Sequence, residues 1–489
     1  MTGRSDRIAL YGLLVLTLFR LVMAGSMPVT PDEAYYWTWS RHLQLSYLDH
    51  PPMVALWIRL GTALFGDTAF GIRVLGPLVA AAGTILVVKT CRILMRYRGE
   101  TTRQSVPLVA GILLNAMLAV ATGALLMTPD TPLLFFMAVF LWAAACLLHS
   151  GKPAWWLVIG LCAGLGFDSK YTMVLPVAGL GLWCLCSKRG RHSLLTPWPW
   201  MGLSLAALLS LPVVWWNAHH EWASFIRQGG RTGEWHPAKA LGYFGELLGG
   251  QIGLLTPGIF LLVVIACAHA MRRRDAVNGL LLCLIGVPCL VFAQHALGDR
   301  VQPNWPVIVY PALAILVALS GMKGWKAASA LGYGLSILVI FQAATGLLPL
   351  NRHFDVSLRQ GGGWDGFARN IATHANGASI VLSDEYGLAS ELAFHLGEHP
   401  VAGAEPRWAL FAFPQPGCSE GWALLVHNAR RSFTPGTPWD EIAQPIGEVV
   451  RERGGREAER YGLYRVACPL SRVPSAWLRM LPSPRPQYY

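Results

Sequence analysis

Apolar stretches of about 20 residues, separated by short turns, recur along residues 1–350 and limit the folds open to this chain. A helix of that length crosses the hydrocarbon core of a bilayer. The stretches lack the alternating pattern of outer-membrane strands, so helices are the expected spanning form. Only 13% of all residues are charged, about half the share usual in soluble domains. The sequence therefore predicts an all-α polytopic membrane protein.

Basic residues follow alternate apolar stretches, at 89–103, 152, 188–191, 272–274 and 323–326. Because cytoplasmic loops are enriched in Lys and Arg, placing every cluster in the cytoplasm predicts about eleven membrane segments with the N-terminus inside. This topology predicts a cytoplasmic-membrane protein whose residues 351–489 lie outside. The predicted segments are 8–25, 71–95, 105–127, 131–149, 154–167, 172–186, 199–216, 252–270, 277–297, 306–321 and 327–348.

The net charge of +12 follows from this topology and gives no reason to expect a nucleic-acid partner. Residues 1–350 hold 25 Lys and Arg against 13 Asp and Glu, whereas residues 351–489 hold 14 of each. The excess thus belongs to the membrane part, where the positive-inside rule accounts for it. The bilayer is the expected partner of this surface.

Two domains are predicted: a transmembrane catalytic domain at 1–350, with its first external loop at 26–70, and a small periplasmic α/β domain at 351–489. Within the second domain, three segments read as strands and one as a helix. The strands are 379–383, 422–426 and 461–466, and the helix is 386–396.

The polar C-terminal segment holds Cys418 and Cys468, whereas the other eight cysteines lie in apolar segments. If the segment is extracytoplasmic, these two could form a disulfide. The sequence leaves that bond open.

The first loop opens with Thr30-Pro31-Asp32-Glu33-Ala34-Tyr35-Tyr36-Trp37. Pro31 suits a first helical turn, and Asp32 and Glu33 suit its N-terminal dipole, which is a purely structural interpretation. The alternative is that one of the two carboxylates deprotonates or positions an acceptor. The aromatic residues could form an interfacial belt, or they could line a groove for a lipid or a sugar.

Asp49 and His50 precede a Pro-Pro step, which holds the backbone extended and both side chains in place. A carboxylate beside an imidazole could bind a divalent metal or a phosphate, or tune a proton transfer. The sequence does not choose among these, so Asp49 and His50 are the metal candidates and no cofactor is certain.

Further polar residues lie at the predicted outer ends of the segments. The two consecutive segments 154–167 and 172–186 are each only about 14 residues, or roughly 21 Å, long. This predicts a short hairpin in which Asp168 pairs with Lys170 or one of them contacts substrate. Arg300, in a short polar turn, could bind a phosphate. Residues 217–251 are predicted to form a long external loop.

These motifs resemble the bacterial branch of the protein O-mannosyltransferase-like glycosyltransferases, which is related to lipid A aminoarabinose transferases and lipopolysaccharide-core glycosyltransferases. The resemblance spans about residues 1–310. Its matching pieces are Pro31–Trp37, Tyr47–Met53, Thr128–Pro132, Lys170-Tyr171, Pro212–Phe225 and Pro303–Pro306.

The resemblance implies a GT-C fold whose active site includes the first external loop. It implies inverting transfer of a sugar from a polyprenyl-phosphate donor to an acceptor outside the membrane. Asp32 would match the general-base candidate, with Glu33 beside it and Asp49 as a second acidic position. His50 stands where the aminoarabinose transferases have a lysine. The implied donor-phosphate and substrate contacts are His50, Arg300, Lys170, Tyr171, Asp130, Asn304 and Trp305.

Several alternatives stay open at this stage. The acceptor could be lipid A or lipopolysaccharide, another envelope glycolipid or glycan, or a protein. A transporter or flippase of lipid-linked sugars would use Asp168 and Lys170 within the membrane. A membrane-anchored binding protein would act through residues 351–489. No Walker or Rossmann signature indicates a nucleotide site.

Overall fold

The structure is a computed structural model that describes residues 3–100, 102, 104–230, 236–397, 399–433 and 437–484. It divides into two compact units, which are described separately. The helical unit comprises Met1–Val22, Leu45–Val54 and Arg73–Leu338, and the sheet unit comprises Met23–Gln44, Ala55–Ile72 and Val339–Tyr489.

Every predicted membrane segment contains a helix, which confirms the polytopic helical part of the fold class. Among the described residues, six helices are long and apolar enough to span a bilayer, and two bent helix pairs could each add one span. The helices are α1 (Arg4–Ser26), α5 (Leu75–Tyr97), α6 (Val106–Ala116), α7 (Leu118–Gly123), α8 (Asp130–Ser150), α9 (Trp155–Phe167), α10 (Val174–Cys186), α11 (Lys188–Leu194), α12 (Pro197–His219), α13 (Ala223–Gly229), α14 (Pro237–Leu255), α15 (Pro257–Arg272), α16 (Ala276–His295), α17 (Tyr310–Ser320) and α18 (Trp325–Thr345).

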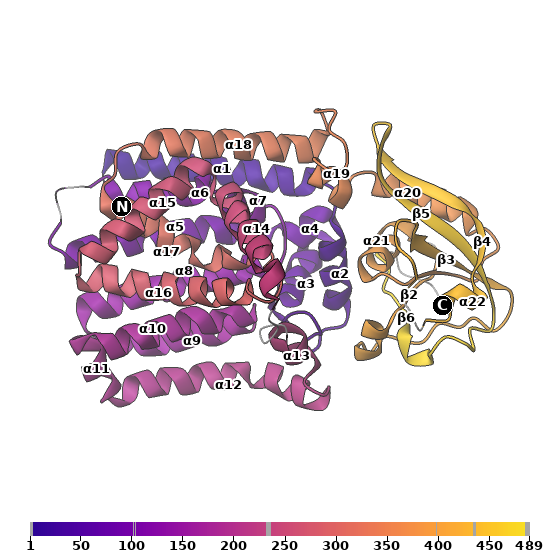
Figure 1. The fold of residues 1–489 in the computed structure, drawn as a ribbon, viewed down its shortest axis with the longest axis horizontal. Coiled ribbons are helices and arrows are strands. Elements are labelled where there is room, and N and C mark those ends of the chain that lie inside the picture. Colours follow the sequence, from indigo (N-terminus) through magenta and orange to yellow (C-terminus); the bar gives the residue numbers. More distant parts are fainter. Residues whose placement is uncertain are drawn as a thin grey trace. The chain divides into compact units, whose positions relative to one another are not determined.

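Close helix packing builds the core of the helical unit. Helix α8 packs against α5 and α9, and α9 packs against α12 (Figure 1). Gly160 of α9 faces Gly202 of α12 so closely that a Cβ on Gly160 would lie 2.0 Å from the Gly202 carbonyl oxygen. Small residues permit such backbone contact between membrane helices. Helix α1 instead exposes Ile8, Val15 and Val22, as a lipid-facing helix does.

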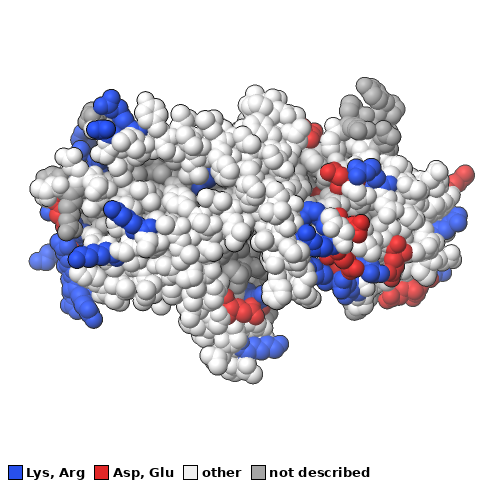
Figure 2. Space-filling view, turned by 90° about the horizontal axis from the view of Figure 1, so that it is seen from above, with Lys and Arg blue, Asp and Glu red and all other residues white. Residues whose placement is uncertain are grey.

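Basic residues mark one end of this helix bundle, called here the basic end. Arg92 near the end of α5 pairs with Asp6 at the start of α1, at 2.9 Å. Arg98 pairs with Asp275 before α16, also at 2.9 Å. Figure 2 shows Lys and Arg gathered at this left-hand end, beside an almost uncharged band. Helix α8 ends just before Lys152, another basic residue, and begins at Asp130. Asp130 therefore lies at the end of the bundle opposite the basic end.

The predicted long loop at 217–251 is wrong for residues 217–230 and 236–251, while residues 231–235 lie outside the described ranges. Helix α12 continues to His219, α13 follows, and α14 begins at Pro237, which is favourable at a first helical position. The glycines of Pro237–Leu255 suggested a loop, but the segment is a helix that bends by 108° into α15. Arg227, which appeared to lie in a loop, is therefore on a helix.

The sheet unit contains a six-stranded mixed sheet in the order β4-β5-β3-β1-β2-β6. The three predicted strands and the predicted helix are confirmed, and so is the α/β character of the C-terminal part of the fold class. The boundary at residue 350 stays a prediction. The strands are β1 (Ile380–Ser383), β2 (Val401–Ala404), β3 (Trp422–Asn428), β4 (Gln444–Arg453), β5 (Arg456–Ala467) and β6 (Leu478–Met480).

Helices surround this sheet within the sheet unit. Strand β1 pairs in parallel with β2 and β3, while β5 runs antiparallel to both β3 and β4. Helix α20 packs against β4, and α21 packs against β1, β2 and α2. The helices are α2 (Pro31–Arg41), α3 (Met53–Phe65), α4 (Ala69–Arg73), α19 (Val356–Gly361), α20 (Trp364–His374), α21 (Tyr386–Leu396) and α22 (Trp439–Ile442).

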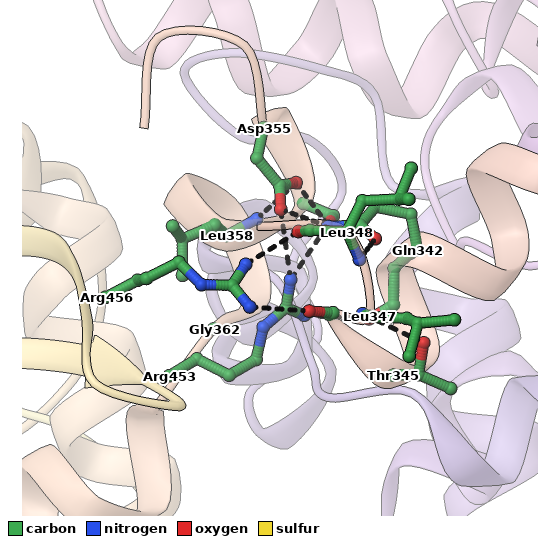
Figure 3. A network of polar contacts seen from close by, with 12 residues as sticks. Gln342, Thr345, Leu347, Leu348, Asp355, Leu358, Gly362, Arg453 and Arg456 are labelled. Atoms are coloured by element: carbon green, nitrogen blue, oxygen red, sulfur yellow. Dashed lines mark hydrogen bonds and ion pairs between the residues drawn. The ribbon is translucent and has the colours of Figure 1, made fainter. Parts of the chain in front are cut away.

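The β4–β5 hairpin caps the C-terminal end of α18 (Figure 3). Arg453 donates to the Ala343 carbonyl at 3.0 Å and pairs with the buried Asp355 at 3.3 Å. Arg456 donates to the carbonyls of Leu348 and Gly346 at 2.6 and 3.1 Å. Cations near the last carbonyls of a helix stabilise that end. This network anchors the hairpin to the end of α18.

Cys418 and Cys468 form a disulfide across a separation of 50 residues. A loop of this length predicts a contribution of about 4 kcal/mol to the stability of the sheet domain. Replacing both cysteines with serine should therefore lower the apparent Tm of purified protein, whereas replacing the exposed Cys186 should not. Equal Tm values for the two variants would contradict the prediction.

Candidate functional site

Lys170 and Asp130 form a buried ion pair at the end of the bundle opposite the basic end. Lys170 lies between α9 and the 3-10 turn Tyr171–Met173, and Asp130 is the first residue of α8. Their atoms Nζ and Oδ1 are 2.7 Å apart, and the side chains are 6% and 14% exposed. Asn304 donates to the other Asp130 oxygen at 2.8 Å. The predicted Asp168–Lys170 pair is wrong, since Lys170 points instead to a carboxylate 40 residues away.

Asp49 pairs with a second cation of the helical unit, Arg227. Arg227 Nε lies 2.6 Å from Asp49 Oδ1, and Gln228 donates to the Asp49 carbonyl at 2.6 Å. Helix α13 supplies both partners. The loop carrying Asp49 is therefore fastened to α13, with a partly exposed guanidinium beside the carboxylate.

His50 is buried close to two cations and two carboxylates. Burial, together with Lys170 and Arg227, lowers the His50 pKa to about 4, although the carboxylates Asp49 and Asp130 act in the opposite direction. His50 is thus neutral at pH 7. It can exchange hydrogen bonds but does not supply the positive charge of a lysine at this position.

Tyr171 extends the polar cluster toward α13. Its hydroxyl lies 2.6 Å from Ser224 Oγ and 3.4 Å from Ser46 Oγ. The Tyr171 ring packs edge-on against Phe167 and Phe225. Lys170, Tyr171, Asp130, Asn304, Asp49 and His50 therefore belong to one neighbourhood of the helical unit, here called the Lys170 cluster.

Two predicted contacts, Arg300 and Trp305, take no part in the hydrogen bonds and ion pairs described for the Lys170 cluster. Arg300 pairs with Glu246 at 2.5 Å, and both side chains are at least half exposed. Trp305 starts the 3-10 turn Trp305–Val309, with its ring near His295 of α16. Roles for Arg300 and Trp305 in phosphate or substrate binding stay predictions.

The donor set around Asp49 and His50 does not fit a divalent metal. Within the described ranges, no group of three or more His, Cys, Asp or Glu side chains is placed to hold an ion. The Asp49 carboxylate is instead paired with Arg227, and the nearby Asp130 carboxylate is paired with Lys170. Both carboxylates near His50 are therefore already engaged by cations.

The other two predicted carboxylates belong to the sheet unit, on helix α2. Glu33 is fully buried and accepts from the Thr30 backbone N–H and hydroxyl at 3.1 and 3.0 Å. Thr30 and Glu33 thus form a capping box. This geometry supports the structural interpretation of Glu33, whose catalytic role stays a prediction.

Asp32 points away from this cap, toward α21. Tyr386 of α21 donates to Asp32 Oδ1 at 3.1 Å. Arg407 stacks on the Tyr386 ring at 4.0 Å and donates to the Tyr35 hydroxyl at 3.2 Å. Asp32 is partly exposed and held by a phenol, as a carboxylate that must reach a substrate would be.

The aromatic residues of α2 do not form a membrane belt. Tyr35, Trp37 and Trp39 are at most 1% exposed. The Trp37 indole donates to Asp67 at 2.9 Å, and its ring packs against Phe394. These rings form a core within the sheet unit, which argues against the interfacial belt that the sequence left open as one alternative.

Residues of α13, of α21 and of the 3-10 turn Pro406–Leu410 at these sites were not predicted as functional. Arg227, Tyr386 and Arg407 carry no motif that would single them out. Ser224 lies within a matching piece of the family resemblance, three residues before Arg227. That proximity is the one feature of the sequence that could have indicated a role for Arg227.

The imidazole of His395 links helix α21 to helix α20 and titrates. His395 lies between Asp365 of α20 at 2.9 Å and the buried Glu391 at 3.2 Å. Burial opposes protonation of His395, but the two carboxylates outweigh it and raise the pKa to about 9. The native state therefore holds a proton that the unfolded chain releases above pH 6.5.

The stabilisation should be complete below pH 6.5 and should disappear as the pH rises toward 9, amounting to at most about 3 kcal/mol. The apparent Tm of purified protein should accordingly fall between pH 6.5 and 9. The variant His395→Gln should lose this pH dependence, while His374→Gln, at an exposed position of α20, should keep it. Parallel curves for both variants would contradict the assignment.

Comparisons with known proteins confirm the family resemblance. Residues 49–216 match the family Dolichyl-phosphate-mannose-protein mannosyltransferase. The chain is 29% identical over 408 residues to the lipid A galacturonosyltransferase RgtD of Rhizobium johnstonii, covering 80% of this chain and 83% of that protein. It is 27% identical over 319 residues to undecaprenyl phosphate-alpha-4-amino-4-deoxy-L-arabinose arabinosyl transferase 1 of Pseudomonas fluorescens, covering 60% and 54%.

The fold is shared with a solved structure. The crystal structure of ArnT from Cupriavidus metallidurans bound to undecaprenyl phosphate superposes with a TM-score of 0.61 at 15% identity, covering 96% of this chain and 99% of that one. The predicted GT-C fold class is thereby confirmed.

Proposed function

We propose that this chain is a polytopic membrane glycosyltransferase that moves a sugar, with inversion, from a polyprenyl phosphate to a lipid A-type or related envelope glycolipid. The Lys170 cluster carries the proposal, because it gathers cations and hydrogen-bond donors where a lipid phosphate would need them. The names of the relatives support the substrate class, since one is a lipid A galacturonosyltransferase and another an arabinosyl transferase acting with undecaprenyl phosphate.

Transfer breaks the bond between the sugar C1 and the phosphate oxygen, and negative charge returns to the phosphate. Lys170 and Arg227 stabilise that charge, while Asp130 and Asn304 hold Lys170 in position. His50, which is neutral at pH 7, contributes a hydrogen bond rather than a charge.

The acceptor hydroxyl attacks C1 and gives up its proton as the new bond forms. By the family resemblance, Asp32 is the candidate base for that proton, and within the sheet unit the Tyr386 hydrogen bond orients its carboxylate. Glu33 fixes the start of α2 as a capping residue. The leaving group is the polyprenyl phosphate.

The basic end faces the cytoplasm, so the N-terminus is inside and the Lys170 cluster opens on the periplasmic side of the bacterial inner membrane. Residues 1–350 form the membrane domain, and 351–489 form a periplasmic domain. The Cys418–Cys468 disulfide supports this orientation, since such bonds persist in oxidising compartments.

The decisive experiment uses purified full-length protein in lipid nanodiscs, a polyprenyl-phosphate sugar and a lipid A acceptor. Mass spectrometry should detect a new glycosidic bond on the acceptor lipid. Movement of the donor across a vesicle without bond formation would instead identify a flippase. Sugar found only on protein would identify a protein O-glycosyltransferase.

A further inference from the structure

A cavity of about 320 Å³ lies in the helical unit, between α1, α5, α6 and α18. This volume is in the range typical of small-molecule sites, about 300–1,000 Å³. Apolar side chains line most of it, among them Leu13, Leu16 and Ile112. From Ala9 to Leu16 it follows α1 over about 10 Å at 1.5 Å per residue.

The deep end of this cavity needs no polar ligand. Asn115 lines it, yet its amide oxygen accepts from the buried Arg20 at 2.8 Å. The Asn115 amide nitrogen donates to Thr84 Oγ1 and the Gly111 carbonyl, both at 2.9 Å. Since the amide is already saturated, the deep end suits a hydrocarbon chain.

The mouth of the cavity is cationic. Lys89 and Arg92 line it, one turn apart on α5, toward the basic end. Arg92 is paired with Asp6 at 2.9 Å. Lys89 is exposed, and the part of the chain that the structure describes holds no carboxylate paired with it. One positive charge without a carboxylate partner therefore lies at the end of the apolar cavity that faces the basic end.

We propose that this cavity binds an anionic glycerophospholipid, with one acyl chain inside it and the phosphate group at Lys89. Within a bilayer an apolar cavity fills with lipid tails at little gain, so the head group decides which lipid stays. The sugar donor is not the expected occupant. Its phosphate belongs at the Lys170 cluster, whereas Lys89 lies near the basic end of α5, whose partners are Asp6 and Asp275.

Two variants separate the charge from the cavity. Lys89→Gln removes the charge, with Lys326→Gln, an exposed lysine at the start of α18, as its matched control. Gly12→Leu fills the cavity, because Gly12 lines it and an added Cβ there meets no atom within 4 Å. Gly334→Leu is the matched control on α18, with equal room but outside the cavity.

Native mass spectrometry of the full-length protein, titrated with chain-matched phosphatidylglycerol and phosphatidylcholine, tests the proposal. Phosphatidylglycerol should bind about fivefold more tightly. Lys89→Gln should abolish this preference, Gly12→Leu should weaken retention of both lipids, and the two controls should match the parent protein. Equal binding of the two lipids, or Lys89→Gln behaving as Lys326→Gln, would overturn the proposal. Displacement of phosphatidylglycerol by undecaprenyl phosphate in a Lys89-dependent manner would overturn it in favour of a polyprenyl lipid.

Discussion

Replacing Lys170 with methionine is expected to lower the rate of sugar transfer by about 10²–10³-fold, the effect of removing one preorganised charge-stabilising group. Lys170 is 6% exposed and pairs with Asp130, so its ammonium is already desolvated and positioned. Its field acts on phosphate charge that develops as the sugar leaves. The measurement is single-turnover transfer by purified protein, with donor binding recorded separately.

The control must separate chemistry from folding, because removing one partner of a buried pair typically costs about 3–5 kcal/mol. The double variant Asp130→Asn/Lys170→Met removes both charges and should recover the apparent Tm but not the activity. Lys152→Met, at an exposed site just after α8, should leave both unchanged. Parent-like transfer by a folded double variant would exclude Lys170 from the reaction.

The helices were predictable because each apolar segment must satisfy its own backbone within lipid. Residues 380–383 and 422–428 were predictable as strands because they are short apolar runs that end up buried. Strand β4 was missed, since its exposed face carries charged side chains and its apolar period is weak. Helix α14 was missed because glycine-rich sequence has low helix propensity, which tertiary packing overrode.

The residue types of the site were predictable, but their partners were not. Asp168 and Lys170 are two residues apart, so a local pair was the natural inference. Packing of α8 against α9 instead brings Asp130 to Lys170. Arg227 reaches Asp49 across 178 residues only because α13 is a helix. Such contacts depend on the fold and leave no local pattern in the sequence.

Replacing Asp32 with asparagine is expected to reduce transfer to a hydroxyl acceptor by about 10²–10⁴-fold, the usual contribution of a general base. The amide keeps the shape of the side chain and can still accept from Tyr386, so α2 and its Thr30–Glu33 cap should persist. A phosphate acceptor is already anionic and needs no base, so the rate of sugar transfer to such an acceptor should not change. The ratio of the two rates for Asp32→Asn is therefore the measurement.

Tyr386→Phe refines this test, because it removes the hydrogen bond to Asp32 while leaving the carboxylate. It should shift the pH profile of transfer with a smaller loss of rate than Asp32→Asn. Asp440→Asn, at an exposed carboxylate in α22, is the matched control and should change neither the rate of transfer nor its pH profile. If folded Asp32→Asn transfers sugar to a hydroxyl acceptor at the parent rate, Asp32 is not the base, and the proton must leave through another group.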